Sequence, residues 1–176
     1  MGKSHTFIRL SLWMVLAVLL GSCALKEAIT GSRRYAPGKD MLGQSPQEVI
    51  FSLGKPAAQL TIPRGARLVF VRGPFGRHSY FVDFDEANRM VAYEQVLTPE
   101  RFARINPGMT RQEVIEIIGP STEKRGLAFR REVWSWRYEN FHCWWFQVEF
   151  EPTGLARSAG NAPLPECRGR SRAGLL

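Results

Sequence analysis

The stretch GQSPQEVIFSLG at residues 43–54 recurs as GMTRQEVIEIIG at residues 108–119. Six of the twelve positions are identical at an offset of 65 residues, and repetition of this kind indicates two copies of one supersecondary unit. Each copy pairs a helix N-cap with a glutamate three residues later, which predicts a capping box: Ser45 with Glu48, and Thr110 with Glu113. We therefore expect two short helices, each ended by the glycine that closes its stretch.

Alternating, aromatic-rich runs follow each helix and predict strands. Within residues 80–85 the apolar side chains fall on one face and two aspartates on the other, and residues 146–151 repeat the pattern. Period two with one polar face predicts an antiparallel sheet covered by helix on one side. The expected strands are 68–71, 80–85 and 89–96 in the first copy, and 133–138, 144–151 and 155–159 in the second. The predicted fold is α+β, two repeated units of short helices packed on an antiparallel β-meander.

The chain divides at points where its composition changes. Its 176 residues are 44% hydrophobic and 23% charged, an ordinary globular composition that excludes wholesale disorder, collagen and coiled coil. We expect a first αβ repeat at 41–97 and a second at 98–162, the latter opening with a short helix near Thr98. A tether at 23–40 precedes them, and a flexible basic tail at 163–176 follows.

The first 23 residues resemble an export signal with a lipidation site. Lys3 and Arg9 precede an apolar run at 10–20, which has the length of a signal-peptide core and is too short to span a bilayer. Small residues then lead to Cys23, in the arrangement of a bacterial lipobox. We expect residues 1–22 to be removed and Cys23 to be lipidated. The alternative is an ordinary secretory signal with a cysteine near its end.

The distribution of charge is informative about partners. Removing residues 1–22 takes away two basic residues and no acid, so the formal net charge falls from +8 to +6. A positive surface attracts anionic phospholipid headgroups. Export argues against nucleic acid, and neither repeat carries a recognition helix or a basic stripe.

Side chains that could support catalysis are sparse. His78 and His142 occupy non-equivalent positions in the two copies, and no serine or cysteine is arranged beside them as a nucleophile. Asp83 and Asp85 are spaced as on a solvated strand face, and nothing in the sequence separates their pKa values. We expect no enzyme activity, no cofactor and no metal site.

Two cysteines and two aromatic residues are the remaining candidates for a functional role. Cys143 and Cys167 either form a disulfide in an oxidising compartment or stay as free thiols. Phe81 and Trp145 fall in register with the polar faces of their strands. They are either contacts for a partner protein or residues that the two units bury against each other.

Several of these features together resemble the BamE (SmpA/OmlA) family of outer-membrane lipoproteins. They are the capped helix at 108–119 with its Gly-Pro stop, the aromatic strand at 134–138 and the strand at 146–150. The resemblance covers 105–156 well and 43–96 more weakly. Members of this family usually carry one such unit, whereas this chain has two, an arrangement that also resembles the β-lactamase-inhibitor-protein architecture.

The resemblance implies a non-catalytic lipoprotein at the periplasmic side of the outer membrane. It implies an accessory or scaffold role in outer-membrane protein assembly and envelope integrity, with the β-barrel assembly machinery as partner. The alternative is a membrane-tethered periplasmic module that binds or inhibits another protein. The residue after Cys23 is alanine rather than aspartate, which favours sorting to the outer membrane by the same resemblance.

Overall fold

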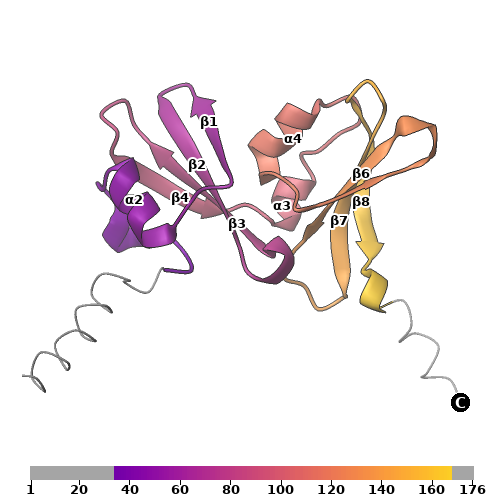
Figure 1. Ribbon diagram of the computed structural model, residues 1–176, viewed down its shortest axis with the longest axis horizontal. Coiled ribbons are helices and arrows are strands. Elements are labelled where there is room, and N and C mark those ends of the chain that lie inside the picture. The colour runs from indigo at the N-terminus through magenta and orange to yellow at the C-terminus, as the bar shows by residue number, and fades with distance from the viewer. Residues whose placement is uncertain (1–33, 168–176) are drawn as a thin grey trace, which may run out of the picture. The chain divides into compact units, whose positions relative to one another are not determined.

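The computed structural model describes residues 34–167 and contains the two predicted repeats (Figure 1). Both lie in one compact unit that begins at Tyr35. The elements of the first repeat are η1 (Lys39–Met41), α2 (Pro46–Leu53), β1 (Ala58–Ile62), β2 (Gly65–Arg72), η2 (Pro74–Gly76), β3 (His78–Phe84) and β4 (Met90–Gln95). Those of the second are α3 (Pro99–Phe102), α4 (Arg111–Ile118), β5 (Glu123–Gly126), η3 (Ala128–Arg130), β6 (Glu132–Arg137), β7 (Trp144–Phe150), β8 (Ala156–Pro163) and η4 (Pro165–Cys167).

Each repeat forms its own antiparallel four-stranded meander, ordered β1-β2-β3-β4 and β5-β6-β7-β8. The registers of the two sheets correspond: Val82 lies opposite Tyr93 in the first, and Val148 lies opposite Ala159 in the second. The pairing register of the last two strands shifts at the same place in both sheets. The shift lies next to the pair that Met90 makes with β3 in the first sheet, and next to the pair that Ala156 makes with β7 in the second. The α+β fold in two repeated units is confirmed.

Both predicted capping boxes are present. The Thr110 hydroxyl accepts a hydrogen bond from the Glu113 backbone N–H at 3.2 Å, and the Glu113 carboxylate accepts one from the Thr110 N–H at 2.7 Å. This bond from a backbone N–H lowers the pKa of the Glu113 carboxyl. Ser45 and Glu48 repeat the arrangement at α2. A helix of two turns is unstable alone, so these caps and tertiary packing must hold it together.

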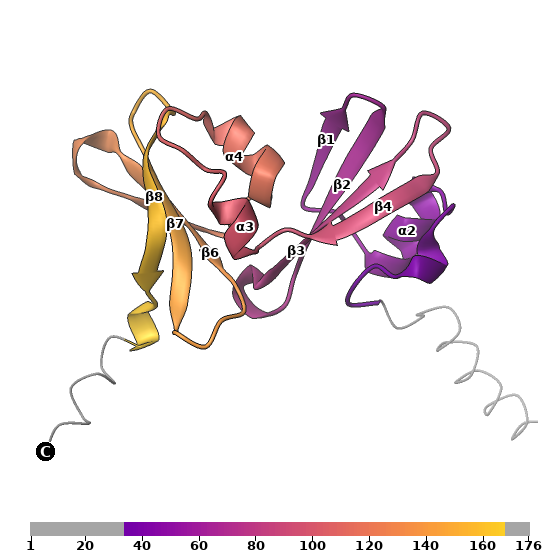
Figure 2. The same cartoon turned by 180° about the vertical axis from the view of Figure 1, so that it is seen from behind.

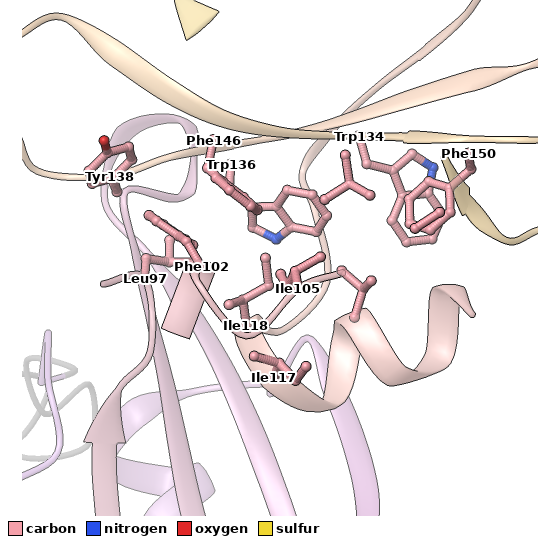
Figure 3. Packing of buried hydrophobic residues seen from close by; sticks show 13 residues of the cluster. Leu97, Phe102, Ile105, Ile117, Ile118, Trp134, Trp136, Tyr138, Phe146 and Phe150 are labelled. Atoms are coloured by element: carbon pink, nitrogen blue, oxygen red, sulfur yellow. The ribbon is translucent and has the colours of Figure 1, made fainter. Parts of the chain in front are cut away.

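The core of the second repeat is aromatic. Figure 3 shows the side chains of Trp134, Trp136, Phe146 and Phe150 on the face of the sheet that meets α4. Phe102, from α3, stacks on Phe146 with their ring centroids 4.3 Å apart. Trp136 donates from its indole nitrogen to the Gly119 carbonyl at 3.1 Å, so the end of α4 is tied to the sheet by a buried hydrogen bond.

Helix α4 contacts both sheets and lies between them in both views (Figures 1 and 2). Val114, Ile117 and Ile118 face the second sheet, whereas Ile115 packs against the cluster of Val69, Phe81, Leu60 and Val96 in the first repeat. The first sheet is therefore covered on both faces, since α2 packs on the other one. The expectation of a solvated outer face was wrong for the first sheet. On the outer face of the second sheet Gln147 and Glu149 stay partly exposed, whereas Ser135 and Arg137 are buried.

The limits of several elements differ from those expected. Two strands were missed, β1 and β5. β5 reads Glu-Lys-Arg-Gly and has no alternation, whereas β1, which reads Ala-Gln-Leu-Thr-Ile, alternates and was overlooked. The tether predicted at 23–40 ends earlier than expected: the Tyr35 hydroxyl shares a hydrogen bond with His78, and η1 begins at Lys39. The expected signal peptide, residues 1–22, lies outside the described residues.

Replacing Thr110 by alanine tests the helix cap. Thr110→Ala removes the acceptor for the Glu113 N–H, and we expect the free energy of unfolding in urea to fall by about 1 kcal/mol. Thr153→Ala, in the exposed turn before β8, is the control and should change it by less than about 0.5 kcal/mol. Equal effects of the two substitutions would contradict a role for the cap.

Replacing Phe81 by alanine tests the packing of α4 on the first sheet. Phe81 is 2% exposed, so Phe81→Ala leaves a cavity and should lower the free energy of unfolding by about 3–5 kcal/mol. Gln147 is its equivalent in the second repeat and makes one hydrogen bond, to the Ser135 hydroxyl at 2.8 Å. Gln147→Ala should therefore cost only about 1 kcal/mol, and a loss as large as that of Phe81→Ala would overturn this account.

Candidate functional site: a pocket between equivalent loops

Two loops at equivalent places in the repeats meet around a pocket. The β2–β3 loop, 73–77, carries Phe75, and the β6–β7 loop, 138–143, carries Phe141 at an offset of 66. The pocket has a volume of about 530 Å³, and its lining includes Arg77 from the first loop and Glu139 and Phe141 from the second. Thr122 Oγ1 donates to the Phe75 carbonyl at 3.1 Å, which fixes the first loop against the start of β5.

Arg137, at the end of β6, forms the polar wall of this pocket. It is 8% exposed, and its guanidinium donates to the carboxylates of Glu123 and Glu166. The hydrogen bond to Glu123 is the main reason that the pKa of Arg137 is raised, with a further contribution from Glu166. Phe75 and Trp145 contact the same guanidinium, with ring centroids 4.3 Å and 5.7 Å from its central carbon. Through these contacts the Arg137 side chain links β6 to β5, to the β2–β3 loop and to the C-terminal segment.

The C-terminal segment closes one side of the pocket. The structure joins Cys143 and Cys167 in a disulfide with the Cα atoms 6.3 Å apart, and the Leu164 N–H donates to the Cys143 carbonyl at 2.9 Å. Leu164 is buried, and Glu166 pairs with Arg137. The predicted flexible tail at 163–176 therefore starts too early: β8 runs to Pro163, and residues 164–167 are tied to the sheet.

The structure places the predicted site residues in different environments. Phe81 is buried beneath α4, so as a partner contact it was wrong, and the alternative that the two units bury this face holds for it. Trp145 is partly exposed beside Arg137, and its indole nitrogen is buried without a hydrogen-bond partner among the described residues. Cys23 lies outside the described residues. Sequence reasoning missed Arg137 and Phe141; comparing the two loops at the offset of 66 would have found Phe141.

His78 is the first residue of β3, and His142 lies in the loop just before β7. His78 shares a hydrogen bond of 2.6 Å with the Tyr35 hydroxyl and places Nε2 3.4 Å from Glu139 Oε1. The His142 ring lies 5.1 Å from that of Trp144. Within residues 34–167 no three His, Cys, Asp or Glu side chains are grouped so that they could hold a metal ion. In the same range no helix has the length and apolar character needed to cross a membrane.

Solved structures resemble this chain only in part. No family model and no curated protein matches the sequence. A solved structure described as an osmotically inducible lipoprotein, OsmE, matches 44% of this chain and 84% of its own at 20% identity, with a TM-score of 0.33. An extracellular protein with an SCP domain, from Bacillus anthracis strain Ames, matches 83% of this chain at 12% identity, with a TM-score of 0.30. The chain spans about half, 53%, of the length of the latter. Likenesses at these values do not assign the chain to a family.

Removing the disulfide tests how firmly the C-terminal segment is held. The bond joins residues 24 apart, and the double variant Cys143→Ser with Cys167→Ser should lower the free energy of unfolding by about 3 kcal/mol. Hydrogen exchange should rise in residues 163–167 and stay unchanged in β2 and β3. Unchanged exchange in 163–167 would show that Leu164 and Glu166 suffice to hold the segment.

The Glu166–Arg137 pair adds a pH dependence of known sign. A hydrogen bond from its own backbone N–H, followed by that from Arg137, lowers the pKa of the Glu166 carboxyl. A carboxyl with a lowered folded-state pKa contributes stability above its ordinary value, about 4.3, and loses it as pH falls through the folded-state pKa. Glu166→Gln should therefore destabilise the protein at pH 7, and this loss of stability should shrink as pH falls through the lowered pKa of Glu166. A loss that does not shrink on acidification would contradict the ion pair.

Proposed function

We propose that this protein is a non-catalytic, lipid-anchored envelope protein that serves as an accessory or scaffold subunit in outer-membrane protein assembly. The observation that carries the proposal is the pocket at the meeting of the two equivalent loops. Phe141, in the lining of the pocket, is 105% exposed, and Phe75, which packs on Arg137, is 63% exposed, although both are large apolar side chains in loops. Exposed aromatic anchors beside a concave surface are typical of protein-binding sites.

The electrostatics of the pocket support binding rather than catalysis. Arg137 is engaged by two carboxylates, and Glu139 lies beside His78, so these four ionisable side chains and His78 are held in pairs or clusters. A general acid or base needs a pKa matched to its task and access to a substrate proton. The paired groups instead fix the shape of the rim, which is what a protein-binding surface requires.

The N-terminal sequence supports the location. The basic start, the apolar run at 10–20 and the small residues before Cys23 have the order of a lipoprotein signal. Lipidation with two or more acyl chains gives stable membrane attachment without a spanning helix. A disulfide at Cys143–Cys167 is consistent with an oxidising compartment such as the periplasm.

The location is tested by replacing the anchor. Wild-type protein should sediment with the outer membrane and require detergent for release, whereas Cys23→Ser should appear in the soluble periplasmic fraction. Mass spectrometry of the wild type should show acyl chains on Cys23. Cys23→Ser protein that still requires detergent would overturn lipid anchoring through this residue.

The partner is tested by crosslinking in intact cells, followed by purification from solubilised outer membranes. The wild type should recover components of the β-barrel assembly machinery, and Phe141→Ala should lower the recovery at least fivefold. Phe129→Ala is the matched control, because Phe129 is 83% exposed on the turn at the other end of β6. Equal loss with both variants, or no assembly component with the wild type, would contradict the proposed role.

A further inference from the structure

One edge of the second sheet is open. β8 pairs with β7 along its length, and on its other side only Ala156 is engaged, through hydrogen bonds of 2.7 Å with Met109 and Gly108. Residues 157–161 are all exposed. Figure 2 shows β8 at the margin of the sheet. Over the described part of the chain no strand pairs with the outer side of β8 beyond Ala156, so its outward peptide groups can accept another strand.

This edge lacks the usual protection against strand addition. Proteins protect exposed edges with lysines, prolines or short strands. The opposite edge strand, β5, follows that rule with four residues that include Lys124 and Arg125. β8 has eight residues, its single charge is Arg157 near its start, and its proline is its last residue. It is the longer and less protected of the two edges.

A pocket of about 330 Å³, lined mostly by apolar residues, lies beside this edge, between β8 and α3. One wall of the pocket contains Phe102 of α3 and Ile105, which follows that helix. The other wall contains Phe146 and Ala159 of the sheet. A strand added to β8 would direct every second side chain toward this face of the sheet, because side chains alternate along a strand. The pocket is thus placed to receive a side chain from the added strand.

The first repeat shows what the pocket lacks. Tyr93 lies opposite Val82 and packs against the core of the first repeat. Ala159 has the same place opposite Val148, and there the pocket lies open. In the first repeat the aromatic side chain of Tyr93 therefore occupies this place, whereas in the second repeat the small side chain of Ala159 leaves it open.

We propose that the β8 edge and this pocket bind an extended segment of another protein, which adds as a fifth strand and inserts a large apolar side chain over Phe102 and Phe146. Strand addition of this kind takes affinity from the backbone and specificity from alternate side chains. A second copy of this chain is a poorer occupant, because β8 itself offers the pocket only small side chains: Ala159, Gly160, Asn161 and Ala162. This site is separate from the pocket between the loops. If no strand binds at β8, the proposed function is therefore unaffected.

A defined peptide tests the proposal on the full chain in detergent micelles. The probe is a fluorescent ten-residue peptide in which threonine alternates with leucine and phenylalanine. It should bind with saturation below about 1 mM and protect β8 amides from hydrogen exchange. Two further peptides carry N-methyl groups on the amides of one edge or of the other. Only one of these should lose binding, because a single edge of the peptide faces β8.

Two matched variants distinguish binding in the pocket from non-specific binding of the peptide. Ala159→Tyr copies the first repeat, and it should lower peptide affinity at least tenfold without lowering the temperature of unfolding. Ala92→Tyr adds the same side chain to the exposed part of β4 and should leave the affinity unchanged. Equal binding of both methylated peptides, or unchanged binding by Ala159→Tyr, would overturn the proposal. So would a wild-type dimer in sedimentation that Ala159→Tyr dissociates, since a second copy would then occupy the edge.

Discussion

The packing of α4 against both sheets is the constraint on which the structure depends. Gly119 ends the helix with φ +77°, where a Cβ would lie 3.2 Å from the Val69 side chain, so the absence of a side chain permits this close approach. On its other side the Gly119 carbonyl accepts the hydrogen bond from Trp136. One helix of eight residues thus contributes to the cores of both repeats, and its capping box fixes where it begins.

The sequence predicted what depends on local chemistry. Both capping boxes follow from residues three apart, and the central strands follow from alternation, so these elements lie where expected. It could not predict contacts that form only between the copies. Phe81 alternates onto the same strand face as Asp83 and therefore looks solvent-facing, yet Ile115 reaches its cluster from the other repeat. Arg137 likewise depends on Glu123, which the pairing of β5 with β6 brings close, and on Glu166, which is adjacent only once the disulfide-linked segment folds back.

The two repeats share a fold and differ in what their surfaces expose. Phe81 corresponds to Gln147, and Tyr93 corresponds to Ala159. The first exchange makes the outer face of the second sheet polar, so that no further helix needs to cover it, as in the terminal unit of a repeat array. The second exchange opens a pocket at the edge. Duplication has thus allowed one copy to specialise in internal packing and the other in exposed surface.

Because α4 belongs to the second repeat but covers both sheets, the two repeats do not depend on each other equally. A chain ending at Gln95 would keep α2 and its sheet but would expose the face formed by Val69 and Phe81 to water, an apolar patch that favours aggregation. A chain beginning at Leu97 would keep α3, α4 and the aromatic core, and would uncover Ile115 and the side of Arg137 on which Phe75 packs. The first repeat therefore needs a helix of the second to cover its sheet, whereas the second repeat carries both of its own helices.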